Sequence, residues 1–190
     1  LTIRKKHMSG IEKILVDASA ARKSLNVLGP ETIDRILERV SEETVNRMEF
    51  ILSENARDLA LMDKSNPLYD RLMLNEDRLR AISSDILKVA GMESPLGQVL
   101  SEYTRPDGLA ISRISVPFGV IGIIYEARPN VTFDVFSLCL KSGNVCILKG
   151  GSDAINSNLA IVQLIKDVLA EFDVSQDILT LLPPGREETS

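Results

Sequence analysis

The sequence predicts an α/β fold, in which a helical N-terminal segment is followed by a β-hairpin and then by half of a Rossmann-like parallel sheet. Three observations predict it. Before residue 97, apolar residues recur every three or four positions, which is the period of amphipathic helices. A Pro-Asp-Gly turn at 106–108 then separates two short strand-like segments. From residue 118 onward, apolar runs of strand length alternate with helical segments, which is typical of a parallel sheet covered by helices.

The front of the chain is expected to form three helices. The first follows an apolar stripe from Ile11 to Leu28, with Ser9 as its cap. The second is expected as one long helix from Glu31 to about Leu61. A loop or a short broken helix is expected at 65–74, and Asn75 has the residue type and place to cap the third helix.

The rear of the chain is expected to alternate strands and helices. The hairpin pairs Val99–Thr104 with Leu109–Val116, and the apolar run Phe118–Tyr125 predicts a strand buried on both faces. The elements expected after it are a buried helix at 131–141, a strand at 145–149, a helix at 153–172 and a strand at 178–182.

Composition excludes several classes of protein. With 22 basic and 27 acidic residues the net charge is −5, which argues against a nucleic-acid-binding protein. No apolar run approaches the ~18 residues that a membrane span needs, so no membrane association is expected. Cys139 and Cys146 lie in apolar segments and are expected to be buried, reduced thiols of a cytoplasmic protein. His7 is the only histidine, so we expect neither a histidine-dependent triad nor a metal site.

The chemistry is expected in the turns that follow the strands, because ligands of open α/β sheets bind at the carboxyl ends of the strands. In the second such turn, Lys149 ends a strand, Gly150 and Gly151 leave the backbone open to a ligand, and Ser152 precedes a helix. This pattern favours binding of an adenine ribose or a phosphate, and its structural alternative is a glycine-rich turn with a serine cap. Neither the dinucleotide fingerprint nor the P-loop motif is present.

The first turn, Glu126 to Asn130, carries a second group of candidates. The Arg128 guanidinium suits a phosphate or a carboxylate, and the Asn130 amide suits a developing oxyanion. The structural alternative is that Asn130 caps the next helix while Glu126 and Arg128 form a local ion pair. The third turn is Pro183-Pro184-Gly185-Arg186.

Several motifs resemble those of gamma-glutamyl phosphate reductases, a family of the aldehyde dehydrogenase superfamily. They are VPFGVIGIIYEARPNVT at 116–132, LCLKSGNVCILKGGSDAINSN at 138–158 and LPPGRE at 182–187, and the front of the chain fits the helical opening of this family more loosely. The resemblance implies three regions. They are a helical segment at 1–97, a hairpin of oligomerisation type at 98–117, and the first half of the cofactor-binding α/β domain at 118–190. The family's nucleophilic cysteine is expected in a domain that lies downstream of this chain.

The resemblance also implies a reaction. It is the NADPH-dependent reduction of L-glutamyl 5-phosphate to L-glutamate 5-semialdehyde and phosphate, in proline biosynthesis. Lys149, Gly151, Ser152 and Gly185 match the region that binds the cofactor, and the absence of a glutamate at Ser152 favours NADPH. For the oxyanion donor Asn130 is preferred, although the spacing from the strand glycine in general aldehyde dehydrogenases points to Arg128, which is otherwise expected to contact the substrate. A homo-oligomer and an association with glutamate 5-kinase are the implied partners.

Two other functions stay open. One is another member of the superfamily, of the CoA-acylating type. The other is a noncatalytic module that binds a nucleotide or a protein partner.

Overall fold

The computed structural model describes residues 10–185, so Ser9 and His7 before them and Arg186 after them lie outside the described residues. The helical part comprises α1 (Gly10–Leu25), α2 (Pro30–Asn46), α3 (Met48–Leu59), the single turn α4 (Tyr69–Leu72) and α5 (Glu76–Ala90). The hairpin is formed by β1 (Val99–Thr104) and β2 (Ala110–Ile114). The α/β part comprises β3 (Val120–Ile124), α6 (Asn130–Lys141), β4 (Val145–Lys149), η1 (Ser152–Ala154), α7 (Ile155–Glu171), η2 (Gln176–Ile178) and β5 (Leu179–Leu181).

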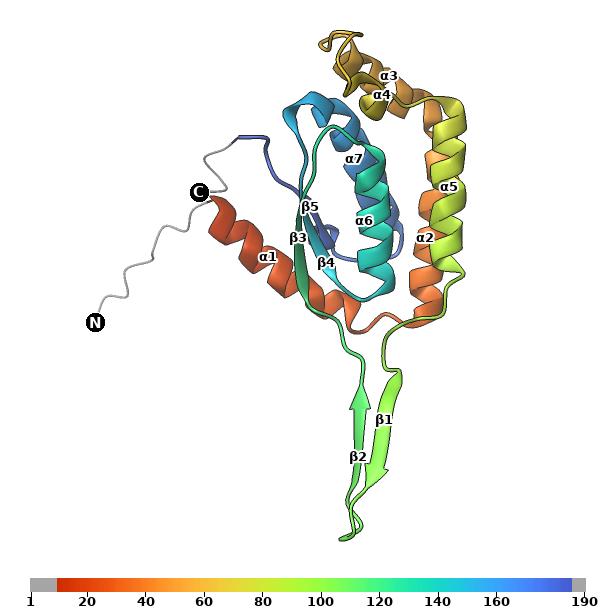
Figure 1. The fold of residues 1–190 in the computed structure, drawn as a ribbon, viewed down its shortest axis with the longest axis vertical. Helices are drawn as coiled ribbons and strands as arrows, with labels where there is room; N and C mark the ends of the chain where they lie inside the picture. The colour runs from red at the N-terminus through yellow and green to blue at the C-terminus, as the bar shows by residue number, and fades with distance from the viewer. Residues whose placement is uncertain (1–9, 186–190) are drawn as a thin grey trace, which may run out of the picture.

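The elements stack in layers around a parallel sheet of order β3-β4-β5 (Figure 1). Helix α1 lies on one face of this sheet, while α6 and α7 lie on the other face. The antiparallel pair α2 and α5 packs outside α6 and α7, and the hairpin projects away from the body. One continuous hydrophobic core includes buried residues of α1, α2, α5, α6, α7 and the sheet. The predicted α/β class, with its helical front, its hairpin and its parallel half-sheet, is confirmed.

Local sequence chemistry explains several element boundaries. The Asn75 side chain accepts a hydrogen bond of 2.8 Å from the Arg78 backbone N–H and caps α5, as predicted. Gly108 adopts φ +87° in the hairpin turn, a conformation that favours glycine. Segment 65–74 contains only the four-residue helix α4, which fits the expected short broken helix.

The prediction of one long helix from Glu31 to Leu61 is wrong. The chain leaves helical geometry at Arg47 (φ −102°, ψ 22°), which separates α2 from α3. Each part packs on a different partner, since α2 packs mainly on α5 and α3 mainly on α7. The sequence carries a sign of this break, because Val40 and Met48 are separated by a stretch whose only large aliphatic residue, Val45, is exposed.

The expectation that the strand at 118–125 is buried on both faces is also wrong for the part of the chain described. β3 is an edge strand of the sheet, and Ile121 and Ile123 pack against the core from one of its faces. On the other face Val120 is 37% and Ile124 76% exposed. Helix α1, which covers this side of the sheet, packs mainly on β4 and η2 and leaves β3 largely uncovered.

Candidate functional site

The carboxyl ends of β3, β4 and β5 lie at one edge of the sheet, because the three strands are parallel neighbours. The Tyr125 N–H donates to the Lys149 carbonyl at 3.0 Å, and the Leu182 N–H donates to the Leu148 carbonyl at 2.7 Å. A Cβ atom at Gly151 would lie 3.6 Å from the Glu126 backbone. The three turns predicted to carry the chemistry are therefore neighbours in space.

Lys149 joins the second turn to the third. Its ammonium group donates to the carbonyl of Pro183 at 3.2 Å and to that of Gly185 at 2.5 Å. This brings two of the predicted cofactor residues, Lys149 and Gly185, into direct contact. The ammonium stays exposed at the sheet edge and keeps a third donor position available to a ligand.

Gly150 is required by the protein's own packing. A Cβ atom there would lie 2.5 Å from Asn158 Nδ2 and 3.3 Å from Tyr125 Oη. The Thr132 hydroxyl donates to Asn158 Oδ1 at 3.0 Å and lies 2.6 Å from the Tyr125 hydroxyl, so the glycine covers a buried polar network. The openness of this turn to a nucleotide therefore depends on Gly151, which is partly exposed.

Ser152 does not cap the helix that follows it. Within the described part of the chain its hydroxyl contacts only Asp153 Oδ1, at 3.4 Å. The N-terminus of α7 is capped instead by Asp58 of α3, a buried carboxylate that accepts hydrogen bonds from the backbone N–H groups of Asn156 and Ser157 at 3.1 and 2.8 Å. These N–H groups are therefore not available to a phosphate. Ser152 lines a cavity of about 370 Å³ whose wall contains the acidic residues Asp58, Asp63 and Asp153.

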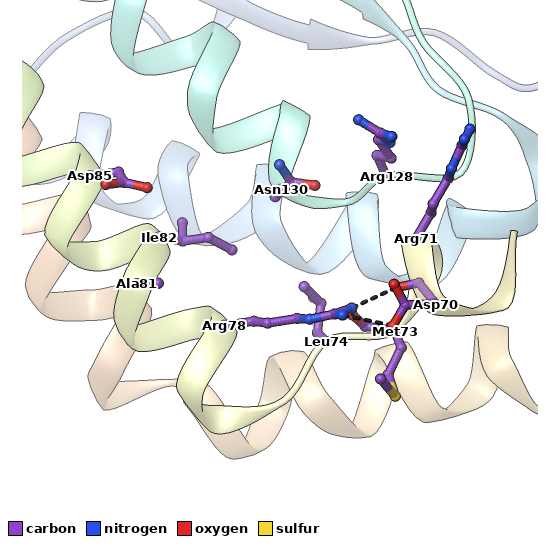
Figure 2. Close-up of a pocket in the computed structure, with 10 residues that line it drawn as sticks. All are labelled: Asp70, Arg71, Met73, Leu74, Arg78, Ala81, Ile82, Asp85, Arg128 and Asn130. Carbon is purple, nitrogen blue, oxygen red and sulfur yellow. Dashed lines mark hydrogen bonds and ion pairs between the residues drawn. The ribbon is translucent and has the colours of Figure 1, made fainter.

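Arg128 and Asn130 line a different cavity, of about 360 Å³ (Figure 2). One wall is the turn between β3 and α6, and the other is formed by α4, α5 and the loop between them. Lys149, Gly151, Ser152 and Gly185 are not among its lining residues. The predicted site residues thus form two groups along one edge of the sheet.

The sequence did not indicate the second wall of this cavity. This second wall contains Arg71 of α4 and Arg78 of α5. Arg78 is held in place by hydrogen bonds to the carbonyls of Asp70 and Met73, at 2.5 and 2.6 Å, and by an ion pair with Asp70. Within residues 10–185, the guanidinium groups of Arg71 and Arg128 have no hydrogen bond or ion pair, and both are exposed. The cavity therefore offers two free cationic groups.

Neither structural alternative for the first turn is observed. Pro129, not Asn130, precedes the first turn of α6, and no side chain caps it. Among the described residues Glu126 and Arg128 form no ion pair; they share only a backbone hydrogen bond of 2.8 Å. The Asn130 amide donates to Asp134 Oδ2 at 3.1 Å, one turn along α6. Partial burial raises the pKa of Asp134 above its ordinary value, against the effect of this hydrogen bond.

The two cysteines are buried, as predicted. Cys146 is 1% exposed and its thiol donates to the Ile178 carbonyl at 3.7 Å. Contact with the Cys139 thiol, together with burial, raises the pKa of Cys146 well above its ordinary value. Cys146 is therefore neutral and shielded, the opposite of what a nucleophilic cysteine requires.

Across residues 10–185, no helix combines the length and the apolar character that crossing a membrane demands.

Comparison with known proteins identifies close relatives. The gamma-glutamyl phosphate reductase of Bacteroides thetaiotaomicron is 58% identical over 171 residues, which are 90% of this chain and 41% of that protein. The crystal structure of the Thermotoga maritima gamma-glutamyl phosphate reductase superposes with a TM-score of 0.84 at 36% identity, covering 92% of this chain and 44% of the other. The Saccharomyces cerevisiae structure gives a TM-score of 0.88 at 28% identity, covering 96% and 48%. The chain thus spans about two fifths of the length of the curated relatives it matches.

More distant structures share the fold alone. Glyceraldehyde-3-phosphate dehydrogenase from Methanocaldococcus jannaschii, solved in complex with NADP, has a TM-score of 0.69 at 16% identity, over 93% of this chain and 36% of that one. PnpE, solved in complex with nicotinamide adenine dinucleotide, has a TM-score of 0.72 at 17% identity, over 93% and 34%. No model of a known protein family matches the sequence.

Proposed function

Because the chain belongs to the gamma-glutamyl phosphate reductase family, matching the N-terminal part of its members, we propose that it is part of an enzyme that reduces L-glutamyl 5-phosphate. The products are L-glutamate 5-semialdehyde and phosphate, and the reaction belongs to proline biosynthesis. The observation that carries this proposal is the cavity in which the free guanidinium groups of Arg71 and Arg128 lie with the Asn130 amide. Cys139 and Cys146 form no disulfide, as is usual for proteins of the reducing cytoplasm, and this supports a cytoplasmic location.

Arg128 and Arg71 would hold the phosphate of the acyl phosphate. Two unpaired guanidinium groups suit a phosphate that must first be bound and then leave. The Asn130 amide has a second N–H besides the one given to Asp134, and that N–H would stabilise the oxyanion that forms when the acyl group is attacked.

Lys149, Gly151, Ser152 and Gly185 would hold the cofactor, for which we propose NADPH. The donor set fits a phosphorylated ribose, because it combines the exposed Lys149 ammonium, the Ser152 hydroxyl, which makes only a long contact of 3.4 Å with Asp153 among the described residues, and an accessible backbone at Gly151. Lys149 would contact the 2′-phosphate, because the acidic cavity beside Ser152 suits ribose hydroxyls better than a phosphate. The distant relatives solved with NADP and NAD support a nicotinamide cofactor, which would supply the hydride.

The experiment is a reverse assay of the full-length protein that carries this segment. It is given L-glutamate 5-semialdehyde and NADP⁺, with inorganic phosphate, with coenzyme A, or with neither. We expect NADPH to form at a rate that requires phosphate. A requirement for coenzyme A would favour the acylating alternative, and no NADPH in any arm would contradict a reductase.

We also propose that the 190-residue chain alone is inactive in this assay. Both of its cysteines are buried, which shields their thiols from a substrate, and the pKa of Cys146 is raised as well. NADPH production by the 190-residue chain that exceeds a heat-killed control, and that survives replacement of both cysteines by serine, would contradict this prediction.

A further inference from the structure

A second cavity adjoins the one that holds Arg128 and Asn130 and lies between α5 and α6. Its volume is about 160 Å³, and Asp85 of α5 lines both cavities. The remaining lining residues are Ile86 and Val89 of α5 and Asp134, Ser137 and Leu138 of α6. The two cavities are therefore neighbours that meet at Asp85, one lined by the arginines and the other by two carboxylates.

The two cavities differ in the charges that line them. At the first, Arg71, Arg78 and Arg128 outnumber Asp70 and the shared Asp85, whereas Asp85 and Asp134 are the charged residues that line the second. Asp85, at the junction, has one oxygen paired with Lys88 Nζ at 2.8 Å, while Asp134 accepts from the Asn130 amide. The charge of Asp85 adds to the partial burial that raises the pKa of Asp134. Among residues 10–185, Lys88 pairs with Asp85, whereas Asp134 has only the neutral Asn130 amide and no cationic partner.

The floor of the second cavity carries an unused polar group. Ser137 is 1% exposed, and its hydroxyl has no hydrogen-bond partner among the described residues. Buried hydroxyls in native proteins are almost always hydrogen-bonded, so an unpaired one in a cavity wall indicates that a ligand supplies the partner. A hydroxyl oxygen can accept from an N–H donor, as the two carboxylates can.

From this arrangement we propose that the second cavity binds the α-ammonium group of the substrate, with Asp134 and Asp85 as its charged partners and Ser137 as a neutral acceptor. This assignment rests on the proposed function. L-Glutamyl 5-phosphate carries its phosphate at one end and its ammonium at the other. With the phosphate at Arg128 and the reacting carbonyl at Asn130, its carbon chain would follow the apolar seam of Ile82, Ile86 and Leu138 to the carboxylates. The ammonium would then replace the missing cation.

The test compares two aldehydes in the reverse direction with the full-length enzyme, phosphate and NADP⁺. L-Glutamate 5-semialdehyde has the amino group, and 5-oxopentanoate is the same molecule without it. We expect Asp85→Asn to lower kcat/KM for the amino substrate roughly 10- to 100-fold, mainly through KM, and to leave kcat/KM for 5-oxopentanoate near the wild-type value. Asp134 also holds the Asn130 amide, so Asp134→Asn should lower kcat/KM for both aldehydes, and for the amino substrate roughly 10- to 100-fold more than for 5-oxopentanoate. Ser137→Ala should change the same preference in the same direction by a smaller factor.

The matched control is Asp77→Asn, because Asp77 is an exposed acid on the same helix as Asp85 and lines neither cavity. It should keep the wild-type preference. The amine of L-glutamate 5-semialdehyde condenses reversibly with its own aldehyde, which lowers the concentration of open-chain substrate. Measuring each variant and the wild type on the same substrate preparation cancels this effect. An active wild type whose aspartate variants keep the wild-type preference would overturn this assignment alone. A wild type without phosphate-dependent activity would overturn the proposed function and this assignment with it.

Discussion

At the residue scale, Lys149 combines a structural contact with the proposed cofactor contact. Its ammonium holds the third turn through Pro183 and Gly185 while remaining exposed. We expect Lys149→Ala in the full-length enzyme to raise the KM for NADPH roughly 10- to 100-fold, because a charge-assisted contact to phosphate or ribose is lost. Turnover at saturating NADPH should fall much less, since the lysine is remote from the hydride. Lys23→Ala, which removes an exposed lysine in the last turn of α1 that lines neither of the two cavities at the sheet edge, is the control. Equal KM values for all three proteins would remove Lys149 from the cofactor site.

Gly150 and Gly151 differ in what a methyl group would meet, although they are neighbours. We expect Gly150→Ala to destabilise the protein by about 1–3 kcal/mol, because its Cβ would lie 2.5 Å from Asn158 Nδ2 within the buried network of Tyr125 and Thr132. Gly151→Ala should leave the melting temperature nearly unchanged, since its closest contact would be 3.6 Å. The melting temperatures of both variants, measured by thermal unfolding, test this prediction. Similar values for the two would show that the side chains of the buried network rearrange around the new methyl group with little loss of stability.

At the element scale, a line of ion pairs joins α2 to α7. Arg39 contacts Glu171 at 2.8 Å and Arg47 contacts Asp167 at 2.5 Å. Glu43 lies between the two arginines, 6% exposed, and contacts them at 2.9 and 2.6 Å. The hydrogen bond from Asn46 lowers the pKa of Glu43 below its ordinary value; the contacts with Arg47 and Arg39 act in the same direction, and burial opposes them.

This lowered pKa predicts a loss of stability in acid. The folded protein stabilises the ionised form of the Glu43 carboxyl group more than the unfolded chain does. This contribution to the free energy of unfolding is present above the ordinary pKa of 4.5 and is lost as the pH falls through the lower pKa of the folded state. The hydrogen-exchange protection of peptides from α2 and α7, corrected for the intrinsic pH dependence of amide exchange, should therefore fall below about pH 4.5, and Glu43→Gln should flatten this pH dependence. Glu38→Gln is the control, because Glu38 lies on the same helix, is exposed and forms no ion pair within residues 10–185. Identical pH profiles for the two variants would contradict the role of Glu43.

The hairpin is an element without a partner inside the described chain. Residues on both of its strands are exposed, among them Leu100 at 56% and Tyr103 at 59%, and an isolated two-stranded hairpin is marginal in water. We propose that it pairs with another chain or with the rest of the enzyme, and that its free edges make the isolated segment prone to aggregate. Tyr103→Asp should lower the mass of the full-length assembly in light scattering, whereas Thr104→Asp, on the opposite face, should lower it less. A monomeric wild type with a protected hairpin would contradict this proposal.

At the scale of the whole molecule, the features predicted from sequence are those with local causes. The Asn75 cap, the Pro-Asp-Gly turn and the apolar strands at 145–149 and 178–182 each depend on residues within a few positions. The break at Arg47 and the cap that Asp58 provides to α7 depend on partners about 100 residues away, which no local pattern reveals. The same holds for the candidate site. Turns after strands indicated Arg128 and Lys149, but Arg71 and Asp85 become lining residues only because α4 and α5 pack beside α6.

The contact between the first helix and the last described segment has a consequence for synthesis. Ala18, Ala21 and Leu25 are buried where α1 packs on β4 and η2. A ribosome adds roughly 5–20 residues per second, so the surface that covers these side chains emerges about 10–30 s after they do. Throughout this interval the apolar face of α1 stays exposed on the nascent chain, where it is a binding site for chaperones. The apolar face of α1 thus stays uncovered during synthesis for longer than that of α2, whose main partner α5 is made soon after it.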